Sequence, residues 1–390
     1  MRDDEERQAW ISLASVEGAA EETLAVLIGQ FGSAQEVLRR AADGRLALWS
    51  KGTVNANGRH PLNGPVLADL EAVARDPEAR LRAIADLGLW TLTPLDRPYP
   101  SRLRDLDPPP PVIHGLGDPE ALLQRRAVAV VGTRRPTPAG RLLTTRICAR
   151  LVECGAAVIS GLAIGIDGTA HAATVERGGL TVGVIGAGHR RPGPRAHAAL
   201  RDRIAEHGGA VISEHHPKVR ATKGTYPRRN RIIAALGDAV IVVEAPLRSG
   251  ALITARHALE LGRQVFVAPG RVGDWSVAGS LTLLRDSPAR PLVGLDELVA
   301  DLGDFEPTED DPPTAGGQAD RARKPALAML GPAERQVAER LCAGPAGLDL
   351  LVAETGLPPS VVSSAVTLLL LRGWAQPMGP AYLPSGPLAE

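Results

Sequence analysis

The sequence AVAVVGTRRPTP, residues 127–138, joins a run of five apolar residues to a turn of glycine, threonine and arginine. An apolar, β-branched run of this length predicts a strand that is buried on both faces, as in a parallel sheet. The turn leads into a segment of helix length from about Pro138. Strand, glycine turn and helix in this order form the repeating unit of a doubly wound α/β fold.

The same unit recurs along the middle of the chain. Further short apolar runs are separated by helix-length segments: residues 156–160 (AAVIS), 180–185 (LTVGVI), 209–213 (GAVIS), 239–244 (AVIVVE) and 264–268 (QVFVA). The pattern predicts an α/β fold with a doubly wound, mostly parallel, Rossmann-like sheet covered by helices on both faces. Ligand-binding loops are then expected at the carboxyl ends of the strands.

The expected loops carry glycine, hydroxyl and basic residues. Three of them open a helix: Gly132-Thr133-Arg134, Ser160-Gly161 and Ser249-Gly250. Unpaired backbone N–H groups and the positive end of the helix dipole suit a phosphate at such a position. All of these loops should meet at one edge of the sheet, where we expect a single basic groove.

The segment GTYPRRNR, residues 224–231, follows the fourth strand in an expected long loop. A tyrosine ring can stack on an unpaired base, and guanidinium groups bind phosphates through paired hydrogen bonds. The candidate DNA-binding residues here are Lys223, Tyr226, Arg228, Arg229, Asn230 and Arg231. The alternative is a solvated, arginine-rich loop that caps a helix.

The distribution of charge favours the nucleic-acid interpretation. The chain has 44 basic and 44 acidic residues, but residues 125–270 contain 22 arginines and lysines against 9 aspartates and glutamates. Two of the four lysines, Lys218 and Lys223, fall just before the tyrosine. A basic middle between acidic ends is expected when one domain binds a polyanion and the others do not.

Other classes of site are not indicated. No G-x-G-x-x-G follows a strand and no G-x-x-x-x-G-K-[ST] occurs, which argues against nicotinamide enzymes and P-loop NTPases. Asp167 and His171 could form a metal or acid–base pair, but we expect Asp167 to cap a helix and His171 to be a packed pocket wall. Three cysteines are too few and too scattered for a disulfide framework or a zinc site. We therefore expect no catalytic residues, no metal and no cofactor.

A chain of 390 residues with 44% apolar content suits two or three domains. The expected domains are a helical region at 1–90 of the SAM or helix-hairpin-helix kind, a Rossmann-like domain with an N-terminal extension at 91–300, an acidic flexible linker at 301–325, and a winged-helix-like domain at 326–390. In the first, Gly32-Ser33 is expected to stop one helix and cap the next. The last carries a net charge of −2 over residues 327–390, which favours a protein contact over duplex reading.

The N-terminal sequence MRDDEERQAW is acidic, and no run of about 18 apolar residues occurs. These features predict a cytoplasmic protein with no membrane segment.

Four motifs of this chain resemble the DNA processing protein A (DprA/Smf) family. The resemblance lies in Gly132-Thr133-Arg134, in residues 160–171 (SGLAIGIDGTAH), in residues 226–233 (YPRRNRII) and in residues 249–270. It implies a Rossmann-like domain that binds single-stranded DNA and loads the RecA recombinase in natural transformation and recombination, and a homodimer formed through that domain. It also implies phosphate contacts at Gly132, Thr133, Arg134, Ser160, Gly161 and Lys223, and base stacking on Tyr226.

The alternative class is an enzyme. The related phosphoribohydrolases, which cleave nucleoside monophosphates, use the same kind of sheet and glycine turns. They carry a P-G-G-x-G-T-x-x-E motif after a late strand, whereas residues 245–254 (APLRSGALIT) lack its catalytic carboxylate. A binding protein therefore explains the sequence better than a nucleotide hydrolase does.

The acidic linker generates a prediction about DNA affinity. Seven carboxylates lie between residues 301 and 324: Asp301, Asp304, Glu306, Glu309, Asp310, Asp311 and Asp320. If they compete with DNA for the basic groove, deletion of residues 304–320 should tighten single-strand binding at low salt, and the difference should shrink as salt screens it. Fluorescence anisotropy at 20 and 200 mM salt measures the effect, and an unchanged affinity at low salt would exclude the competition.

Overall fold

The computed structural model describes residues 2–19, 21–52, 62–190, 193–222, 224–303, 327, 329–342, 344–378 and 381–388. The chain divides into two compact units, residues 1–311 and 312–390. Most of the predicted linker, from residue 304 onward, lies outside the described residues, as does Lys223. Asp301 lies in the last turn of a helix that ends at Leu302 and pairs with Arg290 at 2.5 Å, so the start of the predicted linker is still helical.

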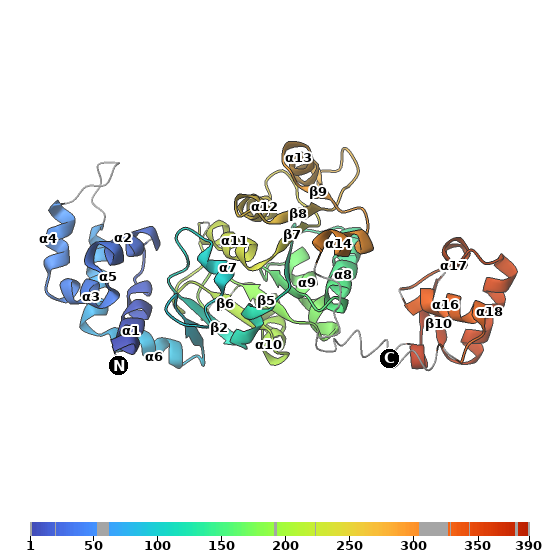
Figure 1. The fold of residues 1–390 in the computed structure, drawn as a ribbon, viewed down its shortest axis with the longest axis horizontal. Helices are drawn as coiled ribbons and strands as arrows, with labels where there is room; N and C mark the ends of the chain where they lie inside the picture. The colour runs from blue at the N-terminus through green and yellow to red at the C-terminus, as the bar shows by residue number, and fades with distance from the viewer. Residues whose placement is uncertain are drawn as a thin grey trace. The chain divides into compact units, whose positions relative to one another are not determined.

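The first unit begins with a group of helices around an apolar core of its own (Figure 1). These helices are α1 (Arg2–Ala14), α2 (Glu21–Phe31), α3 (Ala34–Ala42), α4 (Arg45–Gly52), α5 (Gly64–Arg75) and α6 (Pro77–Ala85). The predicted stop and cap are confirmed, because α2 ends at Phe31 and the Ser33 hydroxyl accepts the backbone N–H of Glu36 at the start of α3.

A nine-stranded sheet follows, in the order β1-β2-β6-β5-β4-β3-β7-β8-β9. Its strands are β1 (Trp90–Leu92), β2 (Ile113–Gly117), β3 (Ala127–Val131), β4 (Ala157–Ser160), β5 (Thr181–Val184), β6 (Ala210–Ser213), β7 (Ala239–Val242), β8 (Gln264–Val267) and β9 (Arg290–Pro291). The strands from β3 to β9 pair in parallel. The predicted fold class is confirmed, and each of the predicted apolar runs contains a strand.

Sequence analysis missed β1, β2 and β9. The first two pair antiparallel with each other and β2 pairs antiparallel with β6, so they extend one edge of the parallel sheet. Their sequences, WTL and IHGLG, are too short or too rich in glycine to give a strand signal. The two-residue β9 carries no signal of its own and forms only against β8.

Helices cover the two faces of the sheet. They are α7 (Ser101–Arg104), α8 (Pro138–Glu153), α9 (Ile166–Glu176), α10 (Ala198–Glu206), α11 (Thr225–Leu236), α12 (Gly250–Glu260), α13 (Ala278–Asp286) and α14 (Leu295–Leu302), with short 3₁₀ turns at Pro119–Leu123 and Arg195–His197.

Alternate residues of β3 show how the two layers form. Ala129 and Val131 pack with α11 and α12, whereas Val128 and Val130 pack with α8, α9 and α14. Side chains of a strand point alternately to the two faces, so a strand buried on both faces must be apolar throughout. The free cysteines Cys148 and Cys154 are buried.

The order of the strands reverses beside β3. From β3 the chain moves outward through β4, β5 and β6, and it then returns to the other side of β3 with β7, β8 and β9. The turns after β3 and β7 therefore diverge above the sheet. Such a switch point opens a crevice at the carboxyl ends of the strands, which is where open α/β sheets bind ligands.

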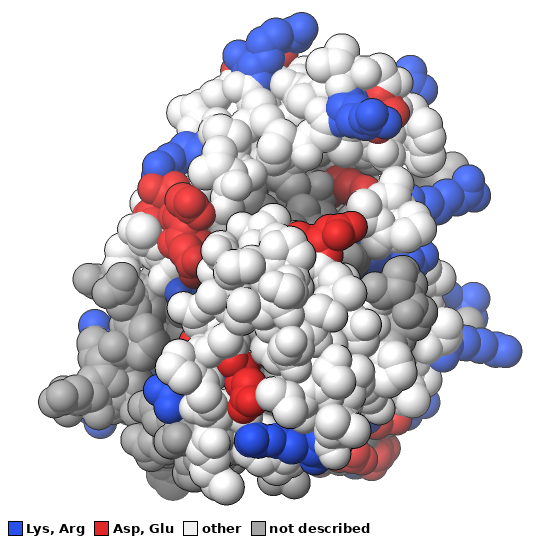
Figure 2. All heavy atoms as spheres, turned by 90° about the vertical axis from the view of Figure 1, so that its right-hand side faces the viewer, with Lys and Arg blue, Asp and Glu red and all other residues white. Residues whose placement is uncertain are grey.

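The second unit contains α16 (Pro332–Cys342), α17 (Leu348–Thr355), α18 (Pro359–Leu371), the antiparallel hairpin β10 (Ala375–Met378) and β11 (Ala381–Pro384), and a 3₁₀ turn at Gly386–Leu388. This order of helices and hairpin agrees with the winged-helix-like fold that was expected for this end of the chain. The face of this unit seen in Figure 2 is mostly uncharged and has no continuous basic surface. Among the described residues no single helix is long and apolar enough to cross a membrane, but α17 and α18, bent by 116°, pass that test as a pair by length and composition.

Gly165 fixes the contact between the turns after β3 and β4. Its φ of 102° and ψ of −132° lie where side chains are rarely tolerated, and a Cβ there would overlap the carbonyl oxygen of Thr133. The next residue, Ile166, donates its N–H to that same oxygen at 3.1 Å. The approach of the two turns therefore requires glycine.

We expect Gly165→Ala to lower the free energy of unfolding by more than about 3 kcal/mol, since backbone strain and steric overlap add. The control is Gly262→Ala, where φ is 68° but no atom lies within 4 Å of an added Cβ; it should cost only about 1–2 kcal/mol. Urea unfolding of both variants measures the difference, and equal losses would contradict this account.

Candidate nucleic-acid interface

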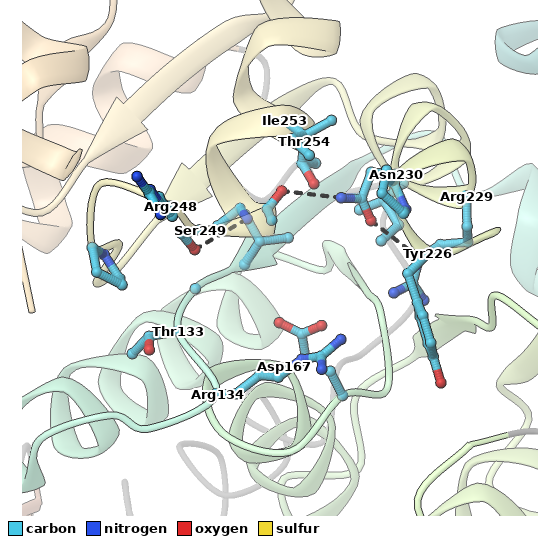
Figure 3. A pocket seen from close by; sticks show the side chains of 18 of the residues that line it. Thr133, Arg134, Asp167, Tyr226, Arg229, Asn230, Arg248, Ser249, Ile253 and Thr254 are labelled. Atoms are coloured by element: carbon cyan, nitrogen blue, oxygen red, sulfur yellow. Dashed lines mark hydrogen bonds between the residues drawn. The ribbon is translucent and has the colours of Figure 1, made fainter. Parts of the chain in front are cut away.

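A pocket of about 830 Å³ lies at the switch point, above the carboxyl ends of β3, β4 and β7 (Figure 3). Residues from the turns after β3, β4, β6 and β7 line it together, so the predicted convergence of these loops is confirmed. Eight of the candidate residues are in its wall: Gly132, Thr133, Arg134, Tyr226, Arg229, Asn230, Ser249 and Gly250. They come from positions up to 118 residues apart, from 132 to 250.

Arg134 and Tyr226 form a pair in this wall. The guanidinium carbon of Arg134 lies 5.4 Å from the centre of the Tyr226 ring, a cation–π distance. Arg134 is exposed and Tyr226 is half-buried. In Figure 3, Arg248 lies on the opposite side of the pocket from Tyr226. Two exposed cations therefore border a space that an aromatic ring also faces.

The expectation that YPRRNR lies in a loop was wrong. Helix α11 begins at Thr225, so Tyr226 and the following residues form its first turns. Pro227 is the third residue of the helix, where its missing N–H costs nothing because the first N–H groups of a helix have no partner within it. Successive residues of a helix point about 100° apart, so neighbouring basic residues cannot all face one ligand.

Arg229 points into the protein rather than toward solvent. Its guanidinium donates to the carbonyl oxygen of Gly161 at 2.7 Å and to that of Val184, and only 4% of the residue is exposed. Burial lowers the pKa of Arg229 to about 10, so the group keeps its charge at neutral pH. Its role is to hold α11 against the ends of β4 and β5.

The two residues that follow Arg229 also form polar contacts within the protein. Asn230 donates to the carbonyl oxygen of Gly250 at 3.0 Å and so links α11 to α12. Arg231 binds the buried carboxylate of Glu214 at 2.5 Å. Arg228 is half-buried and is not in the pocket lining. Arg228, Arg229 and Arg231 remain predictions as DNA ligands, and their positions favour a structural role for the last two.

Asp167 is the counter-charge of Arg229. It lies in the first turn of α9, and the expectation that it caps this helix was wrong, because Gly165 is the N-cap residue. Burial raises the pKa of Asp167, while Arg229 and backbone N–H groups of Ala163, Gly161 and Gly132 act to lower it. A buried carboxylate of the protein therefore lies beside a glycine turn at which sequence analysis expected a DNA phosphate.

The carboxylate of Glu244 accepts hydrogen bonds at the start of α8. Its carboxylate accepts the N–H of Thr137 at 2.9 Å and also the hydroxyl of Thr137, which in turn caps the helix at the N–H of Gly140. Only 6% of Glu244 is exposed. A carboxylate of the protein thus fills a second position that suits an anion.

Ser160, Gly161 and His171 lie behind the pocket wall. The Ser160 hydroxyl donates to the carbonyl oxygen of Val130 at 2.6 Å, and the Gly161 carbonyl binds Arg229. His171 is fully buried and bonds Thr181 through Nδ1 at 2.7 Å. The expectation that His171 forms a pocket wall was therefore wrong, although it is packed as predicted. From this stretch of the chain only Ala163 and Asp167 line the pocket, because β4 is buried throughout.

Sequence analysis missed the part played by three residues. Arg248 was noted in its loop but not chosen as a ligand, Glu244 was assigned only to a strand end, and Trp275 was not singled out. The available signal for Trp275 was a tryptophan between aspartate and serine in a turn-rich segment. Within the described part of the chain, no cluster of three or more His, Cys, Asp or Glu is placed to hold a metal ion.

Comparison with known families agrees with this geometry. Residues 90–303 match the model of the family described as DNA recombination-mediator protein A. The chain belongs to this family. Residues 321–379 match the DprA winged helix domain, which agrees with the helices and hairpin of the second unit. The family match covers the whole sheet and the pocket.

Proteins from several bacteria are similar to this chain in sequence. The DNA processing protein DprA of Bacillus subtilis is 36% identical over 222 residues, which cover 57% of this chain and 74% of the relative. The putative DNA processing protein DprA of Mycobacterium tuberculosis is 37% identical over 313 residues, which cover 80% of this chain and 72% of the relative.

Two solved structures of this family resemble the fold. DNA processing protein A from Streptococcus pneumoniae has a TM-score of 0.58 and 28% identity, and the match covers 75% of this chain and 97% of that one. DNA processing protein A from Helicobacter pylori, described for its single-stranded DNA binding mode, has a TM-score of 0.50 and 28% identity, covering 55% and 95%.

The buried histidines of this DprA-family chain predict a loss of stability in acid. Burial is the largest cause that lowers the pKa of His171 from 6.5 to about 3. It also lowers the pKa of His114 from 6.5 to about 3. Because the folded pKa is depressed, stability is fully present above pH 6.5 and is lost as the pH falls toward 3. Each histidine should remove about 1.4 kcal/mol per pH unit in that window.

Urea unfolding at pH 7.5, 6.0, 5.0 and 4.5 measures this decline. His171→Gln should reduce the loss of unfolding free energy per pH unit by the contribution of one histidine. The substitution His207→Gln, at an exposed position, serves as the control. A free energy of unfolding that does not change between pH 6 and pH 4.5 would contradict the assignment.

Proposed function

We propose that this protein binds single-stranded DNA across the pocket at the switch point, holding phosphates with exposed arginines and stacking a base on Tyr226. The observation that carries the proposal is the sorting of charge in the pocket wall. The charged side chains that line it are Arg134, Arg135, Arg248, Arg229 and Asp167. The first three are exposed, whereas Arg229 and Asp167 are 4% and 8% exposed and face each other. A ligand therefore meets only positive charge.

The aromatic residue favours a single strand over a duplex. Stacking on Tyr226 requires a base whose face is free, which a duplex does not offer. Arg134 against the same ring provides a cation for the adjoining phosphate. Neither contact reads the edge of a base, so we expect little sequence preference.

The buried carboxylates determine where phosphates bind. Since Glu244 already accepts the backbone N–H of Thr137 at the start of α8 and the buried Asp167 carboxylate lies in the first turn of α9, the phosphates are expected at the arginine side chains of the pocket rim. Lys223, which lies outside the described residues, is proposed as a further phosphate ligand from its sequence motif. Binding through mobile cations releases counterions and should depend strongly on salt.

Family membership extends the proposal. The Helicobacter pylori relative is described by its mode of binding single-stranded DNA, and the family is described as a recombination mediator. We propose that this chain likewise delivers single strands to RecA during transformation and recombination, in the cytoplasm and as a homodimer through the Rossmann-like domain. The domain limits of 1–90, 91–300, 301–325 and 326–390 stay part of this proposal, as does the absence of catalysis.

Substitution of the rim arginines tests the proposal. Arg134→Ala, Arg248→Ala and Lys223→Ala should each weaken binding of oligo-dT, and each should reduce the log–log salt slope by about 0.7, the contribution of one neutralised phosphate on a single strand. Fluorescence anisotropy over a salt series, with oligo-dT and a matched duplex, measures both quantities.

The control is Arg177→Ala, an exposed arginine that follows α9 at the end of the helix away from the pocket. It should bind like wild type. If the wild type binds oligo-dT no better than the duplex, or if the rim variants match Arg177→Ala, the pocket is not the single-strand site. Release of adenine from AMP by the wild type would instead favour the nucleotide-hydrolase alternative.

A further inference from the structure

We propose that Trp275 is a second stacking platform in this pocket, so that the site takes at least two unpaired nucleotides with their bases on two separate rings. This inference rests on the proposed function, because it concerns the same pocket and the same class of ligand. It adds a base contact that lies outside the motifs by which the sequence was first interpreted.

Exposure distinguishes Trp275 from the other tryptophans. All five tryptophans of the chain lie among the described residues, and Trp275 alone is classed as exposed, with 65% of its surface in solvent. An indole buries a large apolar area when it is covered, so leaving it in water is unfavourable. The same side chain lines the pocket that contains Tyr226 and Arg134.

The backbone around Trp275 holds the ring at the surface. The two residues that follow, Ser276 and Val277, are 7% and 6% exposed. Val277 packs closely on Gly270, where an added Cβ would lie 2.6 Å from a Val277 methyl carbon. The N–H of Val277 also donates to the carbonyl oxygen of Asp274 at 3.3 Å. Because Gly270 and Val277 pack together on either side of it in the sequence, Trp275 lies in a segment whose backbone is held in place.

The two rings come from different elements. Tyr226 is in the first turn of α11, and Trp275 is in the segment between β8 and α13. A volume of about 830 Å³ is near the upper end of the roughly 300–1,000 Å³ that small-molecule sites span. The pocket therefore has room for more than the one base that Tyr226 can stack. Exposed Arg248, which also lines the wall, supplies a cation for the phosphate of the second nucleotide.

Affinity for normal and abasic strands tests the platform. On the full-length protein, Trp275→Ala should weaken binding of oligo-dT about 5- to 150-fold, the loss expected for one base–aromatic stack. It should have little effect on an oligonucleotide of the same length with abasic sites throughout, which keeps the phosphates but has no bases. Trp275→Phe should restore most of the affinity for oligo-dT, since phenylalanine keeps a stacking face.

The matched control is Val272→Ala, an apolar side chain of the same segment that is 94% exposed and does not line the pocket. It should bind both oligonucleotides like wild type. Intrinsic tryptophan fluorescence gives a second measurement: oligo-dT should quench the wild type and Val272→Ala, whereas Trp275→Phe should bind but lose that quenching.

The outcomes separate the two proposals. If the wild type fails to bind oligo-dT, the proposed function fails and the platform fails with it. If the wild type binds but Trp275→Ala binds equally well and quenching persists in Trp275→Phe, the pocket stands and the platform is overturned. An equal loss on normal and abasic strands would show that Trp275 shapes the segment instead of stacking, and would also overturn it.

Discussion

The buried guanidinium of Arg229 is the contact on which the pocket depends. It draws the start of α11 onto the ends of β4 and β5 through the carbonyl oxygens of Gly161 and Val184. It also neutralises Asp167, whose buried carboxylate lies beside the turns after β3 and β4. A buried charge left without its partner is strongly unfavourable, so these elements must close together. Tyr226, three residues earlier on the same helix, is positioned by that closure.

The same interaction decides the electrostatics of the site. Strand-to-helix turns offer backbone donors that attract anions, and here the buried carboxylates of Asp167 and Glu244 already lie at such turns. The acidic groups nearest the pocket are thereby removed from its surface, while Arg134, Arg135 and Arg248 stay exposed. Flexible cationic side chains around aromatic rings suit single-stranded DNA, whose backbone follows no fixed path. A rigid set of backbone N–H groups suits one phosphate of fixed geometry instead.

Local pattern predicted most of the framework. The runs at β3 to β8 were recognisable because a strand buried on both faces must be apolar throughout, and Ser33 was recognisable as a cap because the hydroxyl satisfies a donor within the next turn. By contrast, β1 and β2 exist only through pairing with β6, and the helical start of α11 was hidden by a proline that a first turn tolerates. These elements depend on partners distant in the sequence.

The sequence by itself determined the fold class, the loops that line the pocket and the basic character of the middle of the chain, because strand burial, glycine turns and charge are properties of short segments. Only the tertiary structure decided which basic residues are exposed at the pocket and which bond within the protein. Arg229 and Arg231 are neighbours of Arg228 along the chain, yet the helical rotation of about 100° per residue turns them toward Gly161 and Glu214. Folding also brings Trp275 into the same pocket wall as Tyr226, although the two residues lie 49 positions apart in the sequence.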